Sequence, residues 1–408
     1  MKHMRKFLLF LALVMLVTVS SLSVSAAVIP SDETHRDEVS FFSIFPSLCP
    51  HEEISDWQID SIPAGGVGVM HRVCTVCGTP MESRDLPTLA FNSASLSLTD
   101  NLRVNYKVNK STLDYDFYSN PYVVFEMNNR ESIVTSYTEF EDYYVFSFDN
   151  IAPHLMMDEI RATLHVTALG EDLAGDVQTY SVATYCYRTL ATYATGDYGE
   201  LRTLIVDLLN YGAASQTYVG YKTASLANAA LTAEQASWGT ATTRELTTHK
   251  DISYVSRDNA TVYFTGAGLS LRDSIAIRFK IDVTDVSGLS AKVIGTHGVK
   301  VIPASEFVAT TGGHHIYFDD LTAAQIGETV YITIYDGNTP VSNTISYSVE
   351  SYAYSKLNDA DATLSELVCA MVRYGDAAKA YVDRDAVTPE VPEGGWTEND
   401  KEGWTNPY

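Results

Sequence analysis

Two stretches of the chain decide its fold: LSLTDNLRVNYKV at residues 96–108 and LSLRDSIAIRFKI at residues 269–281. Each begins with Leu-Ser-Leu, has Asp at its fifth position and then alternates apolar with polar residues. Such alternation predicts a β-strand that buries one face. Because the two stretches match position by position, they indicate an internal repeat.

The match continues through the rest of both copies with nearly the same spacing. The matching segments are Phe148-Asp149-x-Ile151 with Phe318-Asp319-x-Leu321, Tyr180-Ser181-Val182 with Tyr347-Ser348-Val349, and Tyr211-Gly212-x-Ala214 with Tyr374-Gly375-x-Ala377. Toward the end of each copy the apolar residues change from a period of two to helical spacing. This change predicts helices near 182–192 and 200–218 in the first copy, and near 349–357 and 364–382 in the second.

The expected fold class is therefore α+β and mainly β, with two tandem antiparallel β-sandwiches that each end in two helices. We call residues 89–224 module A and residues 255–384 module B. The other expected parts are a signal peptide (1–26), an N-terminal linker (27–44), a small zinc-ribbon-like Cys/His module (45–88), a partly helical linker (225–254) and a flexible acidic tail (385–408).

The start of the chain predicts export. Three basic residues precede an apolar run at 7–19, and Val24-Ser25-Ala26 supplies small residues at a cleavage position. The apolar run is shorter than the roughly 20 residues that span a bilayer. We therefore expect a secreted, extracellular protein that does not insert into a membrane after cleavage and that associates with a cell surface only through a partner.

The charge of the chain excludes some partners. With 27 basic and 51 acidic residues, the formal net charge is −24. A surface this acidic repels phosphate backbones and anionic lipids, so no nucleic-acid partner is expected.

The cysteines indicate a metal site. Of five cysteines, three lie in two short N-terminal motifs, Cys49-x-His51 and Cys74-x-x-Cys77-Gly78. Three thiolates and one imidazole suit tetrahedral zinc, and a set of four protein ligands is typical of a structural site. Two alternatives stay open: a disulfide between Cys49 and another cysteine, or a redox pair formed by Cys74 and Cys77. Cys186 and Cys369 are expected to be buried small hydrophobic residues rather than nucleophiles.

An aromatic cluster is the strongest sign of ligand binding. Tyr115, Phe117, Tyr118 and Tyr122 lie within eight residues beside turn formers, whereas the second copy has Ser287-Gly288-Leu289 in this region. Exposed rings beside carboxylates and amides would suit a sugar face or a protein patch. The alternative is that these rings fill the edge of the sandwich.

The residues that both copies share do not suggest chemistry. They are mostly apolar or aromatic residues and Gly, which packing explains, and the sequence lacks the motifs of serine hydrolases, zinc proteases and phosphate-binding loops. We therefore predict no catalytic residues and favour a non-catalytic binding or scaffold protein of a bacterial cell surface, with a glycan or a surface protein as partner. The alternative is a secreted hydrolase acting on glycan or peptide whose carboxylates meet only in three dimensions.

The repeat also resembles a known group of proteins. The Tyr-Ser-Val-x-x-Tyr and Tyr-Gly-x-Ala-Ala segments resemble those of tandem modules in uncharacterised exported proteins of Clostridia-type gut Firmicutes, over residues 89–384. The Cys/His segment preceding them resembles small ribbons found at the ends of such proteins. The resemblance implies a cell-surface or glycan-handling context and supplies no catalytic residue.

Overall fold

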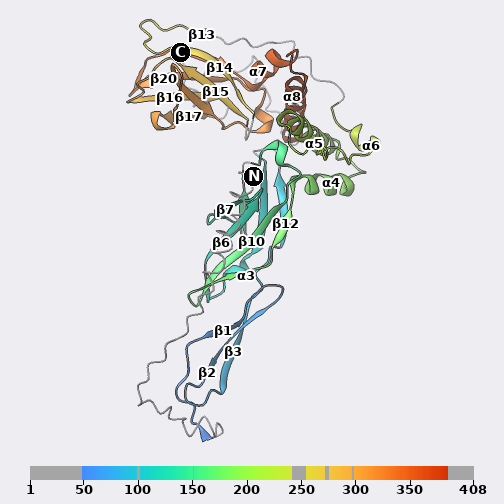
Figure 1. The fold of residues 1–408 in the computed structure, drawn as a ribbon, viewed down its shortest axis with the longest axis vertical. Coiled ribbons are helices and arrows are strands. Elements are labelled where there is room, and N and C mark those ends of the chain that lie inside the picture. Colours follow the sequence, from blue (N-terminus) through green and yellow to red (C-terminus); the bar gives the residue numbers. More distant parts are fainter. Residues whose placement is uncertain are drawn as a thin grey trace, which may run out of the picture. The chain divides into compact units, whose positions relative to one another are not determined.

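The computed structural model describes residues 48–98, 102–149, 151–240, 254–271, 275–295 and 298–384. The fold is mainly β, with several antiparallel sheets that form two sandwich-like sets and a few helices (Figure 1). The expected signal peptide, the 27–44 linker and the acidic tail lie outside the described residues. The chain divides into two compact units, Met1–Asp56 with Arg72–Glu82 and Trp57–His71 with Ser83–Tyr408. The expected domain boundaries stay predictions.

The N-terminal part contains a small sheet. β1 pairs antiparallel with β2, with Gln58 opposite His71, and β3 completes the order β1-β2-β3. The strands are β1 (Gln58–Ser61), β2 (Gly68–Val73) and β3 (Pro80–Leu86).

Module A contains two sheets. The first has the order β4-β5-β9-β8, and the second has the order β11-β10-β6-β7 with β12 also paired to β10. Their bounds are β4 (Ser93–Ser97), β5 (Arg103–Asn109), β6 (Tyr118–Met127), β7 (Arg130–Val134), β8 (Thr138–Glu139), β9 (Tyr143–Phe148), β10 (Ile160–Ala168), β11 (Glu171–Ala174) and β12 (Gln178–Tyr180). A short helix, α3 (Lys110–Leu113), and a 3-10 turn, η2 (Pro153–Leu155), lie between strands.

Module B repeats this arrangement. Its sheets have the orders β14-β15-β19-β18 and β13-β22-β20-β16-β17, with β21 also paired to β20. The elements are β13 (Tyr254–Val255), β14 (Phe264–Ser270), β15 (Ala276–Ile281), β16 (Leu289–Gly295), β17 (Gly298–Pro303), η3 (Ala304–Glu306), β18 (Val308–Thr310), β19 (Gly313–Phe318), η4 (Ala323–Gln325), β20 (Val330–Asp336), β21 (Thr339–Pro340) and β22 (Thr344–Tyr347).

The registers of the two modules agree with the repeat in the sequence. Val104 on β5 lies opposite Phe148 on β9, and the equivalent Ile277 on β15 lies opposite Phe318 on β19. The inward residues of β5 and β15 are fully buried: Val104, Tyr106, Val108, Ile277, Phe279 and Ile281. Alternate side chains of a strand point to opposite faces, so the period of two builds the core of each sandwich. The predicted fold class is confirmed.

The predicted helices are confirmed with small shifts at their ends. They are α4 (Val182–Thr192) and α5 (Gly199–Val219) in module A, and α7 (Val349–Lys356) and α8 (Ala362–Asp383) in module B. From the start of its first helix to the start of its second, the second copy is four residues shorter than the first copy. The helix α7 is three residues shorter than α4, and the loop from α7 to α8 is one residue shorter than the loop from α4 to α5. In the linker, which was expected to be partly helical, Thr232 and Gln235 form a capping box at the start of α6 (Ala233–Ala236).

The glycine of each Tyr-Gly segment lets a long helix approach a 3-10 turn closely. A Cβ at Gly212 on α5 would lie 2.4 Å from Sδ of Met156, just after η2. A Cβ at Gly375 on α8 would lie 2.8 Å from Cδ1 of Ile326, at the equivalent position after η4. A side chain at either glycine would force Met156 or Ile326 to shift, so glycine permits this close packing of helix and turn.

The serine of each Tyr-Ser-Val segment caps a helix. Ser181 Oγ accepts a hydrogen bond from the Thr184 backbone N–H at 3.1 Å, and Ser348 Oγ accepts one from Ser351 at 3.0 Å. These bonds satisfy N–H groups that a helix start otherwise leaves without a partner.

We expect Ser181→Ala and Ser348→Ala each to lower the free energy of unfolding by about 1 kcal/mol, the usual contribution of such a cap. Urea-induced unfolding followed by circular dichroism measures the change. The exposed loop residue Ser256 supplies the matched control, since Ser256→Ala should change stability by less than about 0.5 kcal/mol. Cap variants as stable as this control would contradict the assignment.

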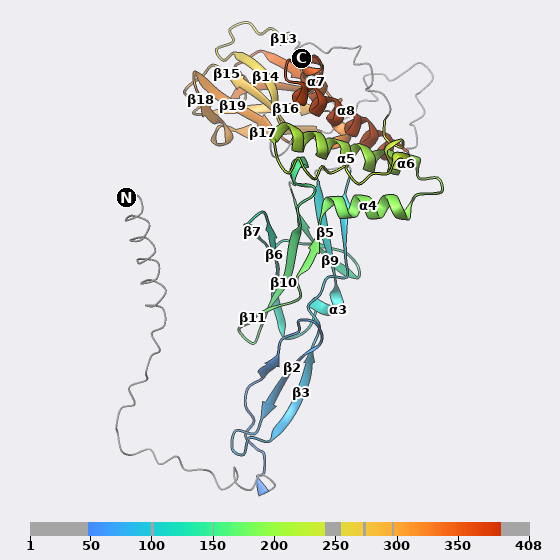
Figure 2. The same ribbon diagram turned by 45° about the vertical axis from the view of Figure 1, so that its right-hand side comes forward.

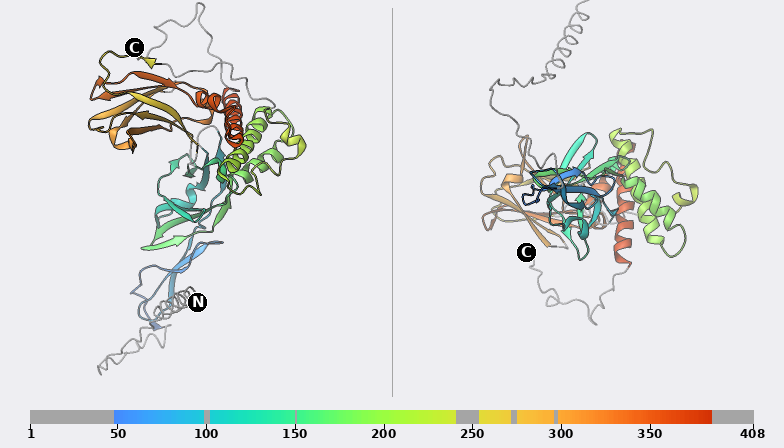
Figure 3. Two further views of the ribbon diagram at one scale, coloured as in Figure 1. Left: turned by 45° about the horizontal axis from the view of Figure 1, so that its top comes forward. Right: turned by 90° about the horizontal axis from the view of Figure 1, so that it is seen from below.

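The equivalent helices α5 and α8 lie side by side (Figures 2 and 3). The ring of Tyr211 on α5 stacks on that of Tyr374 on α8, with centroids 5.8 Å apart, and these two residues are equivalent in the repeat. The Tyr374 hydroxyl donates a buried hydrogen bond of 3.1 Å to the carbonyl of Leu98 in module A. The helix pair thus joins the two modules.

The contacts around this pair are reciprocal. Burial raises the pKa of Tyr185 on α4, and the nearby phenol of Tyr381 on α8 adds to the rise. Burial likewise raises the pKa of Tyr352 on α7, and the nearby phenol of Tyr218 on α5 adds to it. Tyr185 is equivalent to Tyr352, and Tyr218 to Tyr381. Such an exchange of partners is the pattern of a two-fold interface, here between two copies within one chain.

Candidate metal centre

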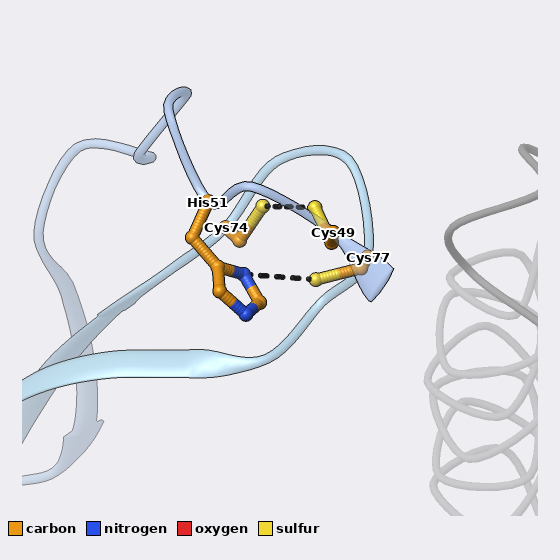
Figure 4. Close-up of side chains that lie close together, drawn as sticks. All are labelled: Cys49, His51, Cys74 and Cys77. Atoms are coloured by element: carbon orange, nitrogen blue, oxygen red, sulfur yellow. Dashed lines mark hydrogen bonds between the residues drawn. The ribbon is translucent and has the colours of Figure 1, made fainter. Parts of the chain in front are cut away.

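The four predicted metal ligands lie together. One ligand atom from each of Cys49, His51, Cys74 and Cys77 falls within 4.8 Å of the others, and all four residues belong to the same compact unit. Figure 4 shows the three sulfurs and the imidazole ring facing a common centre. The predicted Cys/His cluster is confirmed.

Two tight backbone segments aim these side chains. His51 has a positive φ of 55°, which turns the chain sharply two residues after Cys49. Gly78 has a φ of 73°, and its N–H donates to the carbonyl of Cys74 at 2.9 Å. A residue with a side chain rarely adopts the Gly78 conformation, so the glycine that follows Cys77 fixes this turn.

The distances within the cluster fit a tetrahedral metal. Sγ of Cys49 lies 3.6 Å from Sγ of Cys74, and Nδ1 of His51 lies 3.4 Å from Sγ of Cys77. Zinc–sulfur and zinc–nitrogen bonds of about 2.3 and 2.0 Å at tetrahedral angles place two sulfurs about 3.8 Å apart and a sulfur and a nitrogen about 3.5 Å apart. The donor set therefore fits a tetrahedral metal ion in number and type, and these two distances fit its spacing.

The same distances exclude the alternative of a disulfide in this structure. Disulfide sulfurs lie about 2.05 Å apart, whereas all five cysteines here are free. The redox alternative expects the Cys74–Cys77 pair at the start of a helix, but Cys74 forms an isolated β-bridge with Ile54 and is followed by a turn.

The electrostatics of the cluster favour the thiolate form of Cys74 over that of Cys49. The imidazole of His51, together with backbone N–H groups of Val76 and Cys77, lowers the pKa of Cys74 to about 6. Burial raises the pKa of Cys49 to about 11, although the His51 backbone N–H bonds to its sulfur. Backbone N–H groups that point at sulfurs are the supporting contacts expected around a metal-bound thiolate.

Sequence reasoning missed the residues that support the cluster. The Thr79 carbonyl accepts from the Cys74 N–H at 2.9 Å, and Thr79 Oγ1 lies 3.2 Å from Sγ of Cys77. The Thr75 N–H bonds the carbonyl of Glu53 and ties the two motifs together. Their only signal in the sequence was their position beside the cysteines. His71, close to Cys74 in sequence, pairs with Asp60 and does not belong to the cluster.

The aromatic cluster differs from its predicted form. The sequence placed these rings beside turn formers, but Tyr118 and Tyr122 lie within the strand β6. The Tyr118 side chain is buried and its hydroxyl donates to the Pro87 carbonyl at 2.8 Å. The expectation of an exposed ring is therefore wrong for Tyr118, because the strand turns this ring into the core.

The other rings also have partners. The Tyr115 hydroxyl donates to the Asp85 carbonyl, and Phe117 packs edge-on against Trp57 with centroids 5.7 Å apart. Tyr122 stacks on His165, with centroids 4.7 Å apart. A binding role for Tyr115, Phe117, Tyr118 and Tyr122 stays a prediction.

The two remaining cysteines lie apart from the cluster. Cys186 on α4 is buried, and burial raises its pKa, as expected for a small hydrophobic residue. Cys369 on α8 is only partly buried, so that expectation was wrong in part.

Comparisons with known proteins add little. No family model matches the chain, and no curated protein matches it. Among solved structures, a crystal structure of the chicken CNTN1 FN1–FN3 domains is similar, at 10% sequence identity, over 69% of this chain and 74% of that chain. The TM-score of 0.16 is too low for this similarity to carry an argument.

Proposed function

We propose that the chain is an exported, non-catalytic binding or scaffold protein whose N-terminal module is held together by a structural zinc ion. The observation that carries the proposal is the closed donor set of Cys49, His51, Cys74 and Cys77. Three sulfurs and one nitrogen complete a tetrahedron, whereas a catalytic zinc keeps one position open for water or substrate.

The scaffold role is supported by the joined modules. The buried α5–α8 contact, with Tyr211 stacked on Tyr374, joins two equivalent sandwiches. The sequence suggests a glycan or a cell-surface protein as the partner of these modules.

An extracellular bacterial location is supported by the composition of residues 1–26 and by the resemblance to exported proteins. Among the residues that the structure describes, no helix is both long and apolar enough to cross a bilayer.

A chelator experiment tests the structural role of the metal. Hydrogen exchange of the zinc-loaded chain is compared before and after treatment with a strong chelator. We expect loss of protection around residues 49–82, while α5 and α8 keep theirs, because the metal holds only the N-terminal motifs. Chromogenic glycosidase, esterase and peptidase substrates are assayed in parallel. Hydrolysis that stops on chelation would contradict the proposal, as would unchanged exchange in the N-terminal module.

A further inference from the structure

The outward face of the sheet β4-β5-β9-β8 in module A is hollowed. Alternate residues of these strands point away from the core, among them Asn105 and Lys107 on β5 and Tyr143 and Ser147 on β9. They line a hollow of about 340 Å³, within the range of small-ligand sites and large enough for a sugar unit.

Polar groups in this hollow are held in place by one another. The side-chain amide of Asn105 donates to Oγ of Ser97 at 2.9 Å, and the Ser147 hydroxyl donates to Oδ1 of Asn105 at 2.8 Å. A fixed amide and hydroxyl lose little conformational entropy when a ligand arrives.

An aromatic pair forms a wall of the same hollow. The rings of Phe140 and Tyr143 stack with centroids 4.7 Å apart and planes 16° from parallel. A hydrogen bond of 2.9 Å from the Phe140 N–H to the Tyr143 carbonyl holds the turn between them. Phe140 is 44% exposed, so much of this residue is open to solvent.

The charge of the hollow is opposite to that of the chain. Among the described residues that line it are two cations, Arg103 and Lys107, and no carboxylate. In the chain as a whole, acidic residues outnumber basic ones by 51 to 27. Arg103 pairs through Nε with Asp149 beside the hollow, while the Lys107 ammonium lies 3.7 Å from the centre of the Tyr143 ring.

Module B shows that the fold does not require this surface. Lys107 pairs with Val145 and the equivalent Lys280 pairs with His315, so the two registers correspond. At the positions of Phe140 and Tyr143, module B has Thr310 and Gly313. The ring pair is therefore particular to module A.

We propose that this hollow binds a sugar unit that carries a carboxylate or a sulfate. The ring pair would contact the C–H face of the sugar, Asn105 and Ser147 would meet its hydroxyls, and the Lys107 ammonium would meet its anionic group, since Arg103 already pairs with Asp149. A protein partner is less favoured, because a single hollow of this size is far smaller than a stable protein interface. The inference rests on the proposed binding role and specifies its ligand.

Affinity electrophoresis of the full mature chain tests the inference. Native gels are cast with polygalacturonate or chondroitin sulfate as acidic polymers, and with starch or galactomannan as neutral ones. We expect both acidic polymers to retard the wild-type chain, although the chain and these polymers are all negatively charged. Lys107→Gln should weaken this binding about tenfold or more through loss of a charged hydrogen bond, and Phe140→Ala about two- to tenfold.

The repeat supplies the matched control. Lys280→Gln changes the equivalent residue of module B and should leave the retardation unchanged. The inference is overturned if the wild-type chain is not retarded by acidic polymers, if neutral polymers retard it equally, or if Lys107→Gln binds like Lys280→Gln. Melting temperatures close to that of the wild-type chain show that the variants are folded. Metal content and hydrolase activity of the same samples separately test the proposed function, so the two failures are distinguishable.

Discussion

Replacing Cys74 with serine is expected to weaken zinc binding about 100-fold or more and to unfold the N-terminal module. A tetrahedral zinc site distributes its binding free energy over four ligands, and that free energy is also folding free energy for a module this small. Competition with a chromogenic zinc chelator measures the affinity.

The control for this prediction is Cys369→Ser, which removes a thiol on α8 outside the cluster. The Cys369 variant should bind zinc like the wild-type chain. If Cys74→Ser also kept the wild-type affinity, Cys74 would not be a ligand and the assignment of the site would be wrong.

Replacing Tyr374 with alanine is expected to lower the free energy of unfolding by about 3–5 kcal/mol, the usual cost of truncating a large buried aromatic side chain. The residue is 3% exposed, stacks on Tyr211 and hydrogen-bonds the carbonyl of Leu98. Because the pair is reciprocal, Tyr211→Ala should have a similar effect. Denaturant-induced unfolding measures both.

Tyr374→Phe separates the two contributions of this side chain. It keeps the ring and removes the hydroxyl, so it should lower the free energy of unfolding by only about 1 kcal/mol. Alanine and phenylalanine variants of equal stability would show that the stacked ring contributes nothing, which would contradict the described contact between α5 and α8.

Much of the fold could be predicted because the patterns that indicate strands and helices occur in both copies of the repeat. The alternation around Val104 and Ile277 identified paired strands, and the Tyr-Ser-Val segments identified the helix starts near Ser181 and Ser348. The reciprocal contact of α5 with α8 could not be predicted. Two matching sequences show that two modules are alike, but not which of their faces meet.

The metal site could be predicted from spacing, whereas the hollow on module A could not. Cysteine and histidine are common metal ligands, so three cysteines and one histidine in two short motifs already indicate a metal site. The hollow depends on which outward residues of β5 and β9 become neighbours, and this follows from strand register. The density of rings between Tyr115 and Tyr122 could not show that the Tyr118 ring is buried, because ring density in a sequence does not separate an exposed surface from a core.

Native mass spectrometry of the full chain, purified in the presence of zinc, tests the central claim most directly. The account predicts one zinc ion per wild-type chain, no zinc on the Cys74→Ser variant, and five alkylatable thiols after the metal is removed and the chain is unfolded. A metal-free wild-type chain in which Cys49 is oxidised to a disulfide would contradict it.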